Sequence, residues 1–419
     1  MFNLSLKFIK NLKRKLFPFY KSKELKFVFK KLQEDFPRDK IAARFVGGCV
    51  RKYLTGDIID DIDIATILSA DEIKQKFQNT NYKILETGIK HGTMTLISKT
   101  LKLELTTLRK DVETYGRHAQ VEYIDDWKLD SERRDFTINA IYLDINGKIY
   151  DPQMGRNDLR NNNVKFIGDP QKRIEEDYLR IIRFIRFKLM YNSSVEATTA
   201  EAIKLSLDGI QKISKERILI ELLKILELKN IFLINEDTYL KEIFSLIFPE
   251  LIYLKRLDKL KKVYDNSKVK KDLLLAILLI DEKNNHEYFS HKYNVSSTTK
   301  EYLNLLSNNF KQLKEKDYFD KEIEKNIYIN GKNHLISLNT LNFAANNKCK
   351  MSNFLKNLKN IKNSKTYKFP IDGKYLIENG MKEGFTLGKT LKSIETEWLN
   401  NNFKISNKRI QQIIKQNSV

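Results

Sequence analysis

The stretch RFVGGCVRKYLTGDIIDDIDIAT, from Arg44 to Thr66, decides the fold of the first part of this chain. It predicts a strand that ends in two glycines, a short helix, and a second strand in which Asp61 and Asp63 alternate with isoleucines. Successive strand side chains point to opposite faces, so the two aspartates are expected to share one face. Two carboxylates beside a glycine turn suggest a site for magnesium and phosphate. A half-buried strand whose polar face meets only water is the competing interpretation.

Length and charge limit the classes of protein to consider. A chain of 419 residues exceeds the size at which one hydrophobic core keeps growing, so we expect two or more domains. The net charge of +22 and a pI near 9.5 favour a polyanionic partner such as nucleic acid. A composition rich in Lys, Asn and Ile also follows from codon bias, so charge alone does not decide the partner.

Cysteine usage and apolar runs bear on the compartment. Cys49 and Cys349 lie far apart and form no CxxC pair, which fits a reducing cytosol and predicts a cytoplasmic protein. The apolar run from Leu273 to Ile280 is shorter than the about 20 residues that a membrane span needs, so it predicts a buried helix and no membrane contact. Residues 1–25 are strongly basic and predict a solvated N-terminal arm.

The remainder of the first part alternates helix and strand patterns. Apolar spacing predicts a helix over Phe27–Phe36 and a strand over Ala42–Val46. A second helix is predicted over Ala70–Phe77, with Ser69 as its N-cap. The segments YKILETG, KHGTMTLIS and LKLELTTLR then predict three strands. In the third of these strands, Glu104 falls on the polar face and is a candidate third carboxylate, or simply an exposed strand residue.

The pattern changes further along the chain. The polar, poorly periodic segment Arg109–Glu132 predicts a long mobile loop. From Arg173 onward the apolar period is helical, so the fold class is α+β: a mixed head, ending near Asn163, followed by an all-helical remainder. The glycine-marked stretch Phe369–Leu391 predicts short helices joined by tight turns.

The segment RIEEDYLRIIRFIRF, residues 173–187, predicts a helix with an unusual charged side. Asp177, Arg180, Arg183 and Arg186 recur every three residues and spread over about half of the helix surface. A solvated face is one interpretation. A site for a nucleoside triphosphate is the other, because three arginines behind one aspartate suit a polyphosphate and a base.

Base chemistry favours the second interpretation. Cytosine and adenine both present an amino donor beside a ring-nitrogen acceptor, whereas guanine and uracil present a carbonyl acceptor beside an N–H donor. Asp177 is able to accept from the amino group while Arg180 donates to the ring nitrogen. Guanine and uracil would leave buried polar groups unpaired, and discrimination of about 10⁴ is attainable in such a site.

Taken together, these segments resemble the class II tRNA nucleotidyltransferases, the CCA-adding enzymes of the polymerase-β-like nucleotidyltransferase superfamily, whose head motifs are shared by bacterial poly(A) polymerases. The resemblance covers residues 44–226. It rests on the segments GGCVRK, DDIDIAT, TGIKHGTMTL, ELTTLR, RRDFTINA, DPQMGRNDL, EEDYLRIIRFIRF and SKERILIELLKIL.

The resemblance implies roles for individual residues. Asp61 and Asp63 would hold two magnesium ions, and Glu104 falls where the family has an acidic residue on the adjacent strand. Asp177 and Arg180 would read the base. The remaining residues that the family places around the nucleotide are Gly48, Arg51, Arg134, Arg183 and Arg186.

The resemblance also implies a reaction and a domain order. The tRNA 3′ hydroxyl would attack the α-phosphate of CTP or ATP and release pyrophosphate. The basic arm 1–25 would precede a nucleotidyltransferase head over 26–163, a helical neck with the nucleotide-selecting helix over 164–232, and a tRNA-binding helical body and tail over 233–419.

Departures from related families narrow the expectation. No His-Asp dipeptide occurs among the five histidines, which argues against an accessory phosphohydrolase. The segment TGIKHGTMTL looks like the CCA-adding version rather than the basic segment of poly(A) polymerases, and the loop that CC-adding enzymes lack is present. Complete CCA addition or A addition alone is therefore expected, with a poly(A) polymerase and an inactive RNA-binding protein as alternatives.

Overall fold

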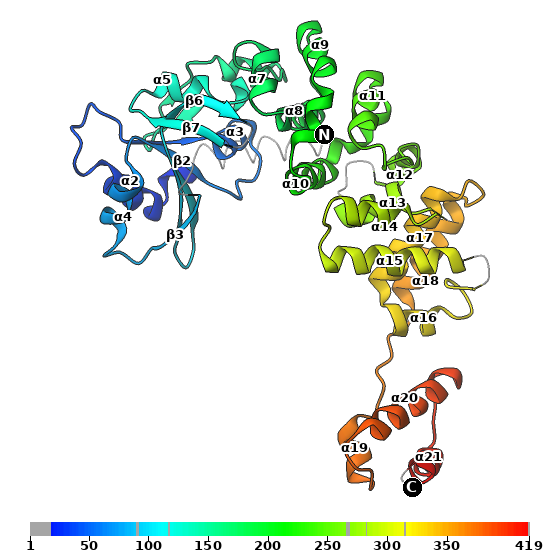
Figure 1. Cartoon of the computed structure of the whole chain (residues 1–419). Coiled ribbons are helices and arrows are strands. Elements are labelled where there is room, and N and C mark those ends of the chain that lie inside the picture. The colour runs from blue at the N-terminus through cyan, green and yellow to red at the C-terminus, as the bar shows by residue number, and fades with distance from the viewer. Residues whose placement is uncertain are drawn as a thin grey trace. The chain divides into compact units, whose positions relative to one another are not determined.

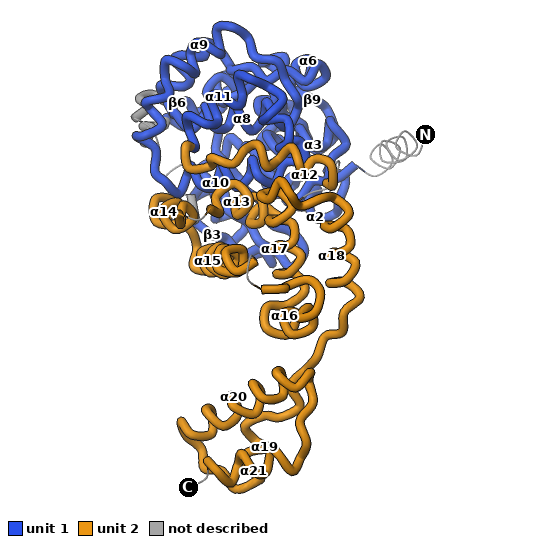
Figure 2. The backbone as a smooth tube through the Cα atoms, turned by 90° about the vertical axis from the view of Figure 1, so that its right-hand side faces the viewer, with its two compact units in different colours: residues 1–248 blue, residues 249–419 orange. Residues whose placement is uncertain are grey.

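The computed structural model describes residues 18–88, 92–115, 118–264, 269–281, 283–313 and 316–417. The chain divides into two compact units, Met1–Phe248 and Pro249–Val419, which Figure 2 distinguishes by colour. Within the described ranges, no helix is both long and apolar enough to cross a membrane. The predicted arm over 1–25 falls largely outside these ranges, since the description begins at Pro18.

A mixed sheet of seven strands forms the head, in the order β3-β4-β5-β2-β1-β8-β9. Figure 1 labels β2 and β3 of this sheet. Its strands are β1 (Ala43–Val46), β2 (Asp63–Thr66), β3 (Lys83–Gly88), β4 (Thr93–Ile97), β5 (Lys102–Thr107), β8 (Tyr142–Leu143) and β9 (Ile149–Tyr150). Strands β2 and β5 run parallel, and the other neighbours are antiparallel. The parallel register places Asp63 opposite Glu104. The predicted mixed head is thereby confirmed, although β2 begins at Asp63 and Asp61 lies just before it.

Helices of the head follow their local sequence signals. They are η1 (Phe19–Lys21), α2 (Lys23–Gln33), α3 (Gly48–Thr55), α4 (Ala70–Phe77), α5 (Trp127–Glu132), η3 (Thr137–Asn139) and α6 (Gly155–Arg160). Helix α4 has the predicted bounds because Ser69 and Glu72 form a capping box, in which each side chain accepts a hydrogen bond from the other's backbone N–H.

The prediction of a mobile loop over Arg109–Glu132 was wrong. The segment forms an antiparallel pair, β6 (Arg109–Tyr115) and β7 (His118–Tyr123), followed by α5. Lys110 and Glu122 face each other across the pair at 2.9 Å. A two-stranded ribbon separate from the main sheet need not bury one face, so it lacks the apolar alternation that announces a strand.

The chain after the head is helical, as predicted. The helices of the first unit beyond the head are α7 (Pro170–Glu176), α8 (Leu179–Tyr191), α9 (Ala197–Leu205), η4 (Leu207–Lys212), α10 (Lys215–Leu226), η5 (Lys229–Asn235) and α11 (Thr238–Ile247). The single helix predicted over 173–187 was wrong, because Asp177 has an extended backbone (φ −155°, ψ 103°) that separates α7 from α8. Its carboxylate accepts a hydrogen bond from the Leu179 N–H, and this local bond starts α8.

In the described residues of the second unit, every regular secondary-structure element is a helix. Its helices are α12 (Arg256–Tyr264), α13 (Lys271–Leu279), α14 (Asn285–Lys292), α15 (Ser297–Gln312), α16 (Ile323–Asn330), α17 (Lys332–Ala345), α18 (Met351–Asn363), α19 (Gly373–Glu378), α20 (Phe385–Asn400) and α21 (Asn407–Asn417). The apolar run from Leu273 lies in α13 and is buried, as predicted. Helices α19 to α21 share a small core that includes Leu376, Ile394 and Ile413. Positive φ angles at Gly380 and Gly384 make the predicted tight turns before α20.

Candidate active site

The glycine turn after β1 brings two carboxylates to the N-terminus of α3. Gly47 has φ +69°, a conformation that favours glycine, and α3 begins at the next residue. A Cβ atom on Gly48 would lie 3.6 Å from Oδ2 of Asp61 and 3.9 Å from Oδ2 of Asp63. The two aspartates therefore converge above the exposed N–H groups of α3, an environment that also attracts phosphate.

Electrostatic repulsion makes this cluster a receptor for a cation. Burial, and then the charges of Asp61 and Glu104, raise the pKa of Asp63 to about 6. The ammonium group of Lys52 lies 2.8 Å from Asp61 and partly compensates the negative charge. A divalent cation would remove the same repulsion more completely.

The donor set fits a metal that is shared with a substrate. Among the described residues, no group of three or more His, Cys, Asp and Glu side chains is arranged to hold a metal ion. Asp61 and Asp63 would hold the cation, leaving its other positions to phosphate oxygens and water, as is usual for magnesium in nucleotide enzymes. Glu104 lies opposite Asp63 in the sheet and acts on it through its charge, and its catalytic role remains a prediction.

Arg51 connects the turn of α3 to the rest of the first unit. Its side chain is buried, its guanidinium donates a hydrogen bond to Oδ1 of Asn139, and it lies 4.7 Å from the ring centre of Phe187 on α8. The charge of Arg51 opposes the rise in the Asp63 pKa. The predicted contact of Arg51 with the triphosphate remains a prediction.

Arg134 is held in place by a buried carboxylate. Its guanidinium pairs with the buried Asp130 at 3.0 Å, and the Tyr142 hydroxyl donates to the same carboxylate at 2.7 Å. Burial would raise the Asp130 pKa, but Arg134 and Arg133 hold it well below its usual range. The charge of Arg134 also opposes the rise in the Asp63 pKa. The predicted contact of Arg134 with the incoming nucleotide remains a prediction.

Arg183 and Arg186 connect α8 to its neighbours. Arg183 donates to Oδ2 of Asp135 from Nε and Nη2, at 2.8 and 2.5 Å, and Asp135 also accepts from Asn139. Arg186 donates to Glu221 on α10 at 2.7 Å. Burial alone would raise the Glu221 pKa, but Arg186 and Arg183 lower it, so this buried carboxylate is ionised. These pairs give α8 a defined position against the head and α10.

The two predicted base-reading residues occupy the break between α7 and α8. Asp177 accepts from Nη2 of Arg217 at 2.7 Å. Arg180 donates from Nη1 to Glu176 at 2.5 Å and to the Arg173 carbonyl at 2.6 Å. A base that is read by Asp177 and Arg180 must therefore share or replace these partners.

Comparison with known proteins agrees with this geometry. Residues 43–165 match the family described as Poly A polymerase head domain, and residues 194–254 match the probable RNA and SrmB-binding site of polymerase A. The CCA-adding enzyme of Staphylococcus haemolyticus is 32% identical over 387 residues, which cover 89% of this chain and 93% of that protein. The chain belongs to the family of CCA-adding enzymes.

Other members of the CCA-adding family match over shorter stretches. The mitochondrial CCA tRNA nucleotidyltransferase 1 is 43% identical over 199 residues in Danio rerio and 39% identical over 257 residues in Homo sapiens. The chain spans 46% and 58% of the lengths of these two relatives. The crystal structure of the Bacillus stearothermophilus CCA-adding enzyme in complex with CTP has the same fold, with a TM-score of 0.68 and 24% identity over 93% of this chain and 95% of that one. Family membership implies a divalent metal.

Several residues that pair with the site residues of this CCA-adding family member were not predicted from the sequence. Asp135 and Asn139 lie within RRDFTINA, Arg217 and Glu221 lie within SKERILIELLKIL, and Glu176 directly precedes Asp177. Each of them lies in a segment on which the family resemblance rests, and this position was the signal that could have identified them. Three of the pairs join residues 35 to 48 positions apart, which pattern alone does not pair. Asp135–Asn139 and Glu176–Arg180 are only four residues apart and were overlooked.

Proposed function

We propose that this protein adds C and A, taken from CTP and ATP, to the 3′ end of tRNA without a nucleic-acid template. In the reaction, the O3′ oxygen of the tRNA forms a bond to the α-phosphorus, the bond between the α-phosphorus and the bridging oxygen breaks, and pyrophosphate leaves. The observation that carries the proposal is the convergence of Asp61 and Asp63 on Gly48. The charges of Arg134 and Arg51 act on Asp63 as well.

We propose magnesium as the metal. Asp61 and Asp63 would hold two ions, one of which would lower the pKa of the attacking hydroxyl while the other would stabilise the leaving oxygen of the pyrophosphate. The chain's own groups do the rest. The N–H groups at the start of α3 and the guanidiniums of Arg51 and Arg134 bind and orient the triphosphate, and Gly48 leaves room for the phosphates to approach the backbone.

Selection of the base falls to Asp177 and Arg180. The Asp177 carboxylate accepts from the amino group of cytosine or adenine, while Arg180 donates to the ring nitrogen. Arg217 orients the carboxylate from α10, and Glu176 holds Arg180 until the base arrives. Arg183 and Arg186 support this selection by fixing α8 through Asp135 and Glu221.

Relatives and charge support tRNA as the partner. The comparison structures include one described as a Thermotoga maritima CCA-adding enzyme complexed with tRNA. The net charge of +22 favours an RNA backbone. A cytoplasmic location is likewise proposed, and fractionation of cells with an antibody against this chain would test it.

The decisive experiment offers tRNA that ends before CCA, after C, or after CC, together with each nucleotide, and sequences the products. Complete CCA addition to the first substrate is the expected result. Extension of only the CC-ended tRNA would make this an A-adding enzyme. Asp61→Ala should remove the activity. Near-normal rates in this variant would contradict the assignment of Asp61 as a metal ligand.

A poly(A) polymerase is the second candidate, because the matched head family carries that description. The two activities differ in the length of the product and in the choice of RNA. Long A tails on unrelated RNA, in a reaction with ATP alone, would favour the polymerase and would count against the proposal.

A further inference from the structure

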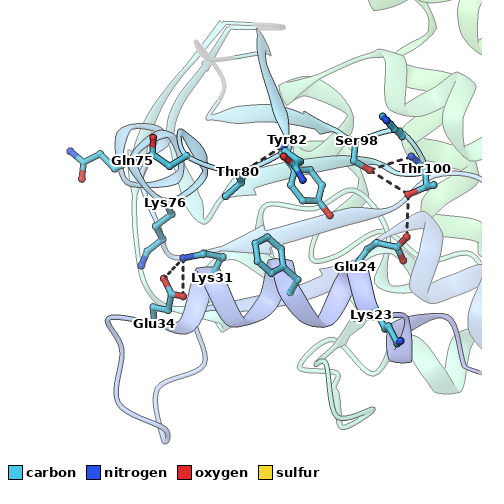
Figure 3. A pocket seen from close by; sticks show the side chains of 14 residues that line it. Lys23, Glu24, Lys31, Glu34, Gln75, Lys76, Thr80, Tyr82, Ser98 and Thr100 are labelled. Carbon is cyan, nitrogen blue, oxygen red and sulfur yellow. Dashed lines mark hydrogen bonds and ion pairs between the residues drawn. The ribbon is translucent and has the colours of Figure 1, made fainter.

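The head contains a pocket that is separate from the carboxylate cluster of Asp61 and Asp63. Helix α2, helix α4 with the turn that follows it, and the turn between β4 and β5 surround a pocket of about 1180 Å³ (Figure 3). None of the residues that line it belongs to the site described above. Its walls combine two aromatic rings, several side-chain amides and several lysines.

The two aromatic rings of the lining are parallel to each other. Phe27 on α2 is 41% exposed, and its ring is parallel to that of Tyr82 within 6°, with the ring centres 6.3 Å apart. Tyr82 is held from behind by an edge contact with the buried Phe77 at 5.8 Å. A planar base that is laid against either ring adopts the same orientation, so both rings contribute to one binding direction.

Side-chain amides line the same pocket. Within the part of the chain that the structure describes, the amide groups of Gln75, Asn79 and Asn81 make no hydrogen bond to other protein groups. An amide offers a donor and an acceptor together, which matches the mixed donor and acceptor edge of a nucleobase. These groups are therefore available to a ligand.

Two lysines of the pocket are available for a phosphate. Lys31 pairs with Glu34, and Lys76 pairs with Asp35. Lys23 and Lys99, at the opposite part of the lining, have no carboxylate partner among the described residues. They add positive charge to a lining that also contains two carboxylates, Glu34, which pairs with Lys31, and Glu24, which accepts from Thr100.

The pocket is held in shape before any ligand arrives. The Ser98 hydroxyl accepts from the backbone N–H groups of Thr100 and Leu101, at 3.3 and 3.1 Å. The Thr100 hydroxyl donates to Glu24 of α2 at 3.1 Å, and Figure 3 shows this bond between the turn and the helix. Such organisation lowers the entropy lost on binding.

We propose that this pocket binds a nucleobase that carries a phosphate, supplied either by a free nucleotide or by an unpaired residue of RNA. The rings stack on the base, the amides of Gln75, Asn79 and Asn81 meet its edge, and Lys23 and Lys99 meet the phosphate. The proposal concerns a site separate from nucleotide transfer and does not depend on the function proposed above.

Photolabelling locates the ligand. The full-length protein is irradiated with 8-azidoadenosine 5′-monophosphate in the presence of excess CTP, and the labelled peptides are identified by mass spectrometry. Label on the peptides that contain Phe27 or the segment 79–82 is the expected result. Label confined to other peptides would overturn the proposal.

Binding measurements with variants test the chemistry. Phe27→Ala should weaken the binding of 2-aminopurine riboside 5′-monophosphate, or of an unpaired hexanucleotide that contains 2-aminopurine, about tenfold, the size expected for loss of one base stack. The Lys23→Ala/Lys99→Ala double variant should weaken binding and reduce its salt dependence. Tyr288→Ala is the matched control, because this ring is 61% exposed on α14 in the other unit.

The two probes separate the sources of the ligand. Phe27-dependent binding of the mononucleotide identifies a free nucleotide, and Phe27-dependent binding of the hexanucleotide alone identifies RNA. Binding of both probes within twofold of the unmodified protein in Phe27→Ala would overturn the proposal. Nucleotide addition to a short acceptor is expected to be unchanged in Phe27→Ala, so failure of this site and failure of the proposed activity are distinguishable.

Discussion

Replacement of Asp63 by Asn is expected to stabilise the metal-free protein while removing a group needed for chemistry. Burial, together with the charges of Asp61 and Glu104, raises the Asp63 pKa from 3.8 to about 6. The rise is roughly two units at about 1.36 kcal/mol each, which corresponds to about 3 kcal/mol of destabilisation. Because the side chain keeps some contact with solvent, we expect a net gain of about 1–2 kcal/mol in the free energy of unfolding.

The sign of the pH dependence follows from the direction of the shift. The folded pKa of Asp63 lies above the unfolded value of 3.8, so the folded protein binds this proton more tightly. The destabilisation is therefore fully present above about pH 6 and is lost as the pH falls towards about 4. The advantage of Asp63→Asn over the unmodified protein should be largest near pH 8 and small near pH 4.

Urea unfolding in EDTA measures this difference. Trp127 reports on the first unit if Trp398, in the second unit, is replaced by Phe in every protein compared. Asp61→Asn is the matched comparison: the Asp61 side chain is 61% exposed and pairs with Lys52. Its replacement removes one of the charges that raise the Asp63 pKa but leaves the burial of Asp63 unchanged, so the gain should be smaller than for Asp63→Asn.

Added magnesium gives a second readout. It should stabilise the unmodified protein and have little effect on Asp63→Asn, because a ligand that binds only the folded state adds to its stability. The reasoning is refuted if Asp63→Asn is no more stable than the unmodified protein in EDTA near pH 8.

Three further predictions concern the site. Gly48→Val should abolish nucleotide incorporation, because its branched side chain enters the space that lies 3.6 Å from the Asp61 carboxylate. Circular dichroism should show that the fold is unchanged. Gly48→Ala should retain part of the activity. Arg217→Ala should lower the preference for CTP and ATP over GTP and UTP at least about tenfold, because Asp177 loses the group that orients it. Single-turnover assays with all four nucleotides measure this preference. An unchanged preference would show that Arg217 has no part in base selection. Glu221→Gln should destabilise the first unit by about 3 kcal/mol in urea, since it leaves Arg186 buried without a charged partner, and a loss under about 0.5 kcal/mol would contradict this.

Local patterns identified most of the elements that hold the site. The alternation in the segment LKLELTTLR placed Glu104 on a strand, and the N-cap residue Ser69 marked the start of α4. These signals act within a few residues of each other, so they are written in consecutive sequence. The pair of strands β6 and β7 carries no such signal and was missed.

The sequence by itself determined the mixed head with a helical remainder, the glycine turn beside two aspartates, and the family to which the chain belongs. Only the tertiary structure showed that Asp177 interrupts the predicted helix and pairs with Arg217, and that Arg183 is held by Asp135 and Arg186 by Glu221. The physical reason is range. Periodicity and capping are local, whereas a buried charge takes whichever opposite charge the packing of distant segments brings within hydrogen-bond distance.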